Sequence, residues 1–103
     1  MIITTTDTIP GRDFETLGLV VGNTVQAKNI GRDILSGLKG VIGGEITAYT
    51  EMLSEAREIA LDRMEKEAEK LGADAVVALR FSTAEAMPGA AELMAYGTAV
   101  RFR

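Results

Sequence analysis

The chain of 103 residues contains no cysteine, no histidine and no tryptophan, and only 5% of its residues are aromatic. Without thiol or imidazole groups it can form neither a disulfide nor a Ser-His or Cys-His catalytic pair. The same absence removes the ligands that zinc, copper and other soft metals favour. Composition therefore excludes most common catalytic chemistry, and the sequence says more about shape and assembly than about activity.

Basic residues are also few, with 11 Lys and Arg against 15 Asp and Glu and a net charge of −4. A nucleic-acid-binding protein usually carries a basic stripe, and none is present. The first residues lack the features of a signal peptide, and the longest uncharged run, 16–27, is shorter than the roughly 18 residues that cross a bilayer. We expect one cytoplasmic domain over residues 1–103, without nucleic-acid or membrane partners.

Periodicity predicts an α+β fold. Apolar residues recur at three- and four-residue steps over 45–71, which is typical of one long amphipathic helix, and Gly72 follows as a stop signal. The elements expected in order are strands at 2–6 and 14–28, the helix 45–71, and strands at 75–83 and 91–102. The expected architecture is a β-β-α-β-β subunit with one long helix packed on an antiparallel sheet.

The strands lack the polar and apolar alternation of a sheet with one face in water. Strict alternation over 75–83 predicts that Ala75, Val77, Leu79 and Phe81 face one way, and that Val76, Ala78 and Arg80 face the other. One helix cannot cover both faces, so we expect a second copy of the chain to cover the face of Val76 and Ala78. An aspartate at either position should then break the oligomer. The alternative is that the glycine-rich stretch 29–44 folds over this face.

Segments along almost the whole chain resemble the YbjQ family of uncharacterised bacterial proteins. The segments that carry the resemblance most clearly are Gly43–Glu45, Tyr49–Thr50, Leu71–Val76, Arg80–Phe81 and Ala95–Val100. The resemblance implies a dodecin-like subunit that assembles into a pentameric ring. It implies no established activity, although members carry a label for heavy-metal binding.

Two kinds of metal ligand remain in the composition. Of the five methionines, Met52, Met64 and Met94 occupy positions typical of core packing. Pairs of carboxylates one helical turn apart could hold calcium or magnesium, and they are Glu51–Glu55 and Glu58–Asp62. The alternative is a solvated helix face, whose expected ion pairs are Asp62–Lys66 and Arg63–Glu67. No residue is assigned to a metal.

Six residues are candidates for contact with a ligand or with another subunit: Arg80, Glu45, Tyr49, Arg57, Glu92 and Tyr96. Arg80 interrupts an apolar strand, and a buried arginine needs a partner such as Glu45, Glu92, a carboxylate of another subunit or an anionic ligand. The alternative for Arg80 is a purely structural ion pair or an exposed strand end. Arg57 leaves the same alternatives open. The two tyrosines could line a pocket between subunits, or they could simply pack.

The sequence thus favours a non-enzymatic homo-oligomer with no cofactor. One alternative is a module that binds a small molecule or a hard cation between subunits. A less favoured alternative is a hydrolase that uses two carboxylates as acid and base.

Overall fold

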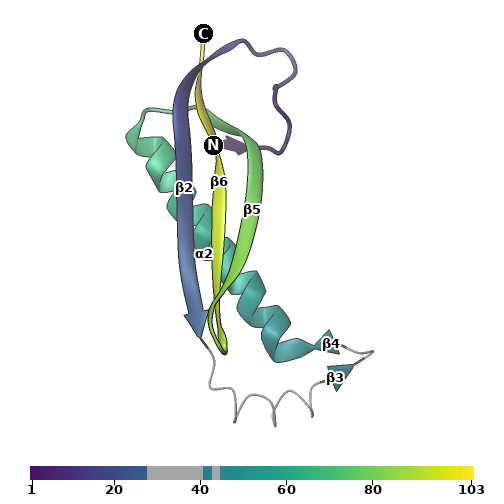
Figure 1. The fold of residues 1–103 in the computed structure, drawn as a ribbon. Helices are drawn as coiled ribbons and strands as arrows, with labels where there is room; N and C mark the ends of the chain where they lie inside the picture. Colours follow the sequence, from purple (N-terminus) through teal and green to yellow (C-terminus); the bar gives the residue numbers. More distant parts are fainter. Residues whose placement is uncertain (28–40, 43–44) are drawn as a thin grey trace.

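A computed structural model describes residues 1–27, 41–42 and 45–103 of the chain (Figure 1). Its elements are β1 (Ile2–Ile3), β2 (Phe14–Ala27), β3 (Val41–Ile42), β4 (Glu45–Ile46), α2 (Thr47–Lys70), β5 (Ala75–Met87) and β6 (Ala90–Phe102). The predicted α+β class and the order of two strands, a long helix and two strands are confirmed. The alternative in which 29–44 covers the sheet concerns a stretch that lies mostly outside the described residues.

The main sheet has four strands in the order β1-β5-β6-β2. Strands β5 and β6 form a hairpin, and β2 pairs antiparallel with β6. The sheet is mixed and not wholly antiparallel, because β1 pairs parallel with the start of β5. Strands β3 and β4 form a separate two-stranded pair.

Helix α2 packs on one face of this sheet, mainly over β2 and β6. It buries every fourth residue along one side: Met52, Ala56, Ala60, Met64 and Ala68. Gly22 on β2 allows the close approach, since a Cβ at this position would lie 2.2 Å from the carbonyl oxygen of Ala60. The helix ends in a Schellman motif, in which Ala73 N–H donates to the Ala68 carbonyl at 3.1 Å and Gly72 has a φ of +75°.

Strand β5 contains a β-bulge at Ala78, whose φ is +54°. The two residues 78 and 79 stand opposite Gly97 alone, so Ala78 is one residue more than the alternation predicts. As a result Leu79 packs with Val76 under the helix, whereas Val77 belongs to the opposite face. The predicted division of this strand into faces is therefore wrong. An aspartate at Val76 would enter the main core and would not test the second face.

A small second core occupies one end of the face opposite the helix. It is formed by Ala75, Val77 and Val100, with Ile9, Phe14 and Phe102 packed beside them. The N-terminal segment 4–13 is tied to the strand below it, because Ala78 N–H donates to the Thr6 carbonyl at 2.9 Å. The guanidinium of Arg12 lies 4.6 Å from the ring centre of Phe102.

The rest of this face, which we call the open face, carries no element of the described part of the chain. In Figure 1 the helix lies behind the sheet, and the open face is turned toward the viewer. Cross-strand pairing assigns to it Leu19, Val21, Asn23 and Val25 from β2, Glu92, Met94 and Tyr96 from β6, and Arg80, Ser82 and Ala84 from β5. Leu19 is 70% exposed and Val25 is 54% exposed. The sequence predicts a second apolar face. The structure has a partly apolar face that no described element covers, although its members differ from those predicted.

Candidate functional site

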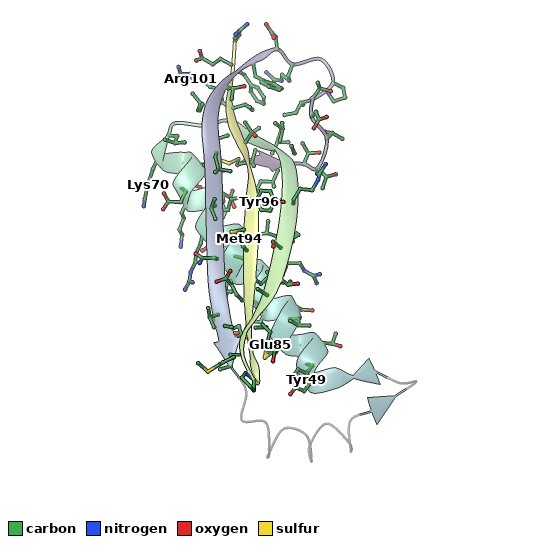
Figure 2. All side chains as sticks on the ribbon, viewed as in Figure 1. Tyr49, Lys70, Glu85, Met94, Tyr96 and Arg101 are labelled. Atoms are coloured by element: carbon green, nitrogen blue, oxygen red, sulfur yellow. The ribbon has the colours of Figure 1, made fainter. Side chains whose placement is uncertain are left out.

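The register of the sheet brings two of the candidate residues side by side. Arg80 on β5 is the cross-strand neighbour of Tyr96 on β6, which in turn pairs with Val21 on β2. Figure 2 shows Tyr96 in the middle of β6, next to Met94. Glu92 shares this face but pairs with Ala84, four residues along the strand from Arg80. At about 3.3 Å per residue, that separation is too large for the predicted Arg80–Glu92 ion pair.

Arg80 is exposed, and its guanidinium contacts backbone oxygens. Nη1 donates to the carbonyl of Thr5 at 3.0 Å and to the carbonyl of Leu79 at 2.7 Å. Of the alternatives that the sequence leaves open, the structure agrees with an exposed position for Arg80, because β5 lies at the sheet edge from this residue onward. Through these two hydrogen bonds Arg80 links the N-terminal segment to β5.

Tyr49 lies at the other end of the molecule, on the first turn of α2 (Figure 2). It is half-buried and lines a groove of about 460 Å³ between the helix and the tip of the β5–β6 hairpin. The residues that line the groove are Tyr49, Met52, Leu53, Thr83, Ala84, Glu85, Gly89, Ala90 and Ala91. Tyr96 is on the opposite face of the sheet, so one chain does not bring the two tyrosines together.

Two candidates take no part in these clusters. Arg57 is exposed on the helix. Glu45 lies in the short strand β4, and its side chain is outside the described part of the structure.

The helix carboxylates behave in part as the sequence predicts. Asp62 and Lys66 form the expected ion pair at 2.9 Å, and this hydrogen bond with Asp62 raises the pKa of Lys66 above its ordinary value of 10.5. Both groups are exposed. Among the described residues no three Asp or Glu side chains converge as a metal-binding group.

The predicted Arg63–Glu67 pair is wrong, because each residue has another partner. Arg63 Nη1 donates to the backbone carbonyl of Asn23 on β2 at 2.7 Å, and Glu67 pairs with Lys70 at 2.9 Å. Helical spacing gives no signal for a contact from the helix to a strand forty residues earlier. The sequence therefore did not identify Arg63 as a helix residue that contacts the edge strand β2.

A family model described as "Putative heavy-metal-binding", that of the YbjQ family, matches residues 1–103. A UPF0145 protein of Archaeoglobus fulgidus is 65% identical over 104 residues, covering 100% of this chain and 96% of the relative. This chain belongs to the YbjQ family. A UPF0145 protein of Thermotoga maritima is 62% identical to this YbjQ-family chain, with coverage of 98% and 96%. The resemblance inferred from the sequence is confirmed.

A solved structure supports the fold of this YbjQ-family chain. A protein of unknown function from the DUF74 family of Pediococcus pentosaceus superposes with a TM-score of 0.67, covering 100% of this chain and 98% of the other. The two sequences are 16% identical, so the similarity concerns the fold alone. In the described residues no helix combines the length and the apolar character needed to span a membrane.

Proposed function

We propose that this YbjQ-family protein acts as a non-enzymatic homo-oligomer, a closed pentameric ring in which the open faces of the copies are turned inward, toward one another. The observation that carries the proposal is the open face itself. Its β2 residues Leu19 and Val25 expose most of their apolar side chains, at 70% and 54%. Large apolar patches on a soluble domain mark surfaces for association.

The shape of one chain supports the same proposal. Its radius of gyration is 16.9 Å, whereas a compact domain of this length has about 13 Å. Its accessible surface is 6576 Å², whereas a compact monomer of this mass exposes about 5,600 Å². An isolated copy thus leaves more surface in water than a self-sufficient domain does, and association would remove part of it.

The groove at Tyr49 favours a second function, the binding of a small molecule. Its volume of about 460 Å³ lies within the range of roughly 300–1,000 Å³ that is usual for ligand sites. Met52 and Leu53 supply apolar walls, and Glu85 supplies the carboxylate of the described lining. We propose a small apolar molecule with one positive charge as the ligand class. With a single carboxylate in that lining, the hydrolase alternative gains no support.

Native mass spectrometry of the wild-type protein and of two leucine variants tests the ring. Leu19→Asp places a charge on the open face and should release monomers. Leu53→Asp places the same charge on the helix side, where Leu53 is 41% exposed, and should keep the ring. A monomeric wild type, or a ring that survives Leu19→Asp and is lost with Leu53→Asp, would contradict the proposal. A stoichiometric extra mass that Leu53→Asp removes would support the ligand site.

A further inference from the structure

The four-stranded sheet ends in two open edges. β2 is the last strand on one side, and β5 is covered by β1 only at Ala75 and Val76. From Arg80 to Met87 every residue of β5 is exposed. Each edge therefore presents backbone groups that no strand of the described chain occupies.

Two hydrogen bonds show which backbone groups point outward. Arg63 bonds the Asn23 carbonyl from outside the sheet, so the N–H and C=O of Asn23 face away from β6. Alternation along the strand gives Val21 and Val25 the same direction. On β5 the N–H of Leu79 donates outward to the Thr4 carbonyl at 3.0 Å.

The same alternation continues along β5 after Leu79. The outward backbone groups of β5 are those of Phe81, Thr83 and Glu85, and β2 presents those of Val21, Asn23 and Val25. Each edge thus offers the outward backbone groups of three residues for hydrogen bonds to another strand.

Proline and charged residues are scarce along both edge strands, although each strand contains a register shift and Arg63 bonds the Asn23 carbonyl of β2. Exposed edges in monomeric proteins are blunted by proline, by charge or by a covering segment. Residues 16–27 of β2 contain no charged residue and no proline, and 81–87 of β5 contain only Glu85 as a charged residue. Long edges with so little charge and no proline can act as templates for another strand.

We propose that the outer edge of β2 in one copy pairs with the outer edge of β5 in the next copy, so that the sheet runs continuously around the ring. This inference rests on the proposed function and identifies the joint between subunits. Both strands run antiparallel to β6 and so point the same way. Rotation about a ring axis along the strands keeps that direction, and the joint is therefore a parallel pair.

Charge favours this joint over the pairing of like edges. Arg63, Lys66, Glu67 and Lys70 of the helix flank the β2 edge, which gives this edge three basic groups and one acidic group. Lys66 and Lys70 pair with Asp62 and Glu67, and the guanidinium of Arg63 bonds the strand itself. Glu85 stands on the β5 edge, on the helix side of the sheet. A β2–β2 joint would bring the basic groups of two copies together. A β2–β5 joint instead places the carboxylate of Glu85 on the same side of the sheet as the basic groups of the neighbouring copy. Each copy then uses both of its edges, which a head-to-tail ring requires.

Two proline variants test the joint. Val25→Pro and Thr83→Pro each remove one outward N–H without touching a bond to β6, and proline is tolerated at such edge positions. Each variant alone should lose the ring in native mass spectra. The matched controls Val25→Ala and Thr83→Ala keep the N–H and should keep the ring.

Mixing the two proline variants gives the most specific result. The Val25→Pro copy retains its β5 edge and the Thr83→Pro copy retains its β2 edge, so they can form a single joint. We expect a one-to-one heterodimer, identified with a heavy-isotope label on one variant. A mixture of folded variants without heterodimer would overturn the joint. A ring that survives both prolines would contradict the joint and leave the proposed ring intact. A monomeric wild type would contradict both the ring and the joint.

Hydrogen exchange on the unmodified protein covers the case in which a proline variant does not fold. The amides of Val25 and Thr83 should exchange at least tenfold more slowly in the ring than in the Leu19→Asp monomer. Equal exchange in ring and monomer would overturn the joint.

Discussion

Gly22 is the residue where helix and sheet come closest. A Cβ there would lie 2.2 Å from backbone atoms of Ala60 and Met64, and neither helix atom can rotate away as a side chain would. Gly22→Ala should therefore destabilise the protein by about 1–3 kcal/mol, the usual cost of overpacking a core. Urea unfolding measures the change.

The neighbouring substitution Asn23→Ala is a suitable control. Asn23 is exposed on the open face, and its alanine variant should stay within about 0.5 kcal/mol of the wild type. Equal stability of Gly22→Ala and wild type would show that the helix can move away from the sheet at little cost.

Arg80 shows where sequence reasoning about single residues stops. The apolar neighbours of Arg80 were visible in the sequence, and they favoured burial. Its actual contacts with the carbonyls of Thr5 and Leu79 depend on the register between β5 and β6 and on the path of the N-terminal segment. Side-chain identities do not encode a contact over so many residues, so the sequence leaves burial and exposure of Arg80 as alternatives and gives no signal for these two carbonyls.

Among the secondary-structure elements, β5 holds the clearest strain. Ala78 has a φ of +54°, where the Cβ of an L residue costs about 1–2 kcal/mol. Ala78→Gly removes that clash but adds freedom to the unfolded chain, so we expect a net gain of up to about 1 kcal/mol in unfolding free energy. Differential scanning calorimetry should show a higher Tm.

Ala95→Gly on β6 is the matched control, because Ala95 is buried in a regular strand. That variant should lose stability, since glycine there adds unfolded-state entropy and removes a packed methyl group. If both variants lose stability, glycine at position 78 does not relieve enough backbone strain to offset its cost in unfolded-state entropy.

The helix was predictable because its buried side repeats every four residues. The predicted range 45–71 and the observed Thr47–Lys70 differ by two residues at most. The bulge in β5 was not predictable, because an alanine occupies the position and gives none of the signal that glycine would. The candidate site followed the same pattern. A second partly apolar face of the sheet could be inferred from the apolar strands, whereas the residues that belong to it depend on the bulge.

For the whole molecule, stability should depend on protein concentration. Binding between copies stabilises the folded state by mass action, so each tenfold rise in concentration should add about 1 kcal/mol of apparent stability per copy of the ring. Urea midpoints measured over three decades of wild-type concentration test this. Val25→Pro should show no such dependence, and a wild-type midpoint that does not move with concentration would contradict assembly.

The extra residue at Ala78 can also be compared with a shift in a reading frame. Side chains of a strand alternate between faces, so one inserted residue would send every later side chain to the wrong side, unless a bulge absorbs it. Deleting Ala78 would leave Val76 and Leu79 under the helix and Val77 and Arg80 opposite, with the frame intact. Deleting another residue of the regular strand would invert whatever follows it. Shortening β5 by one residue should therefore be tolerated at Ala78, and by the same argument at the second register shift, between Glu85 and Met87.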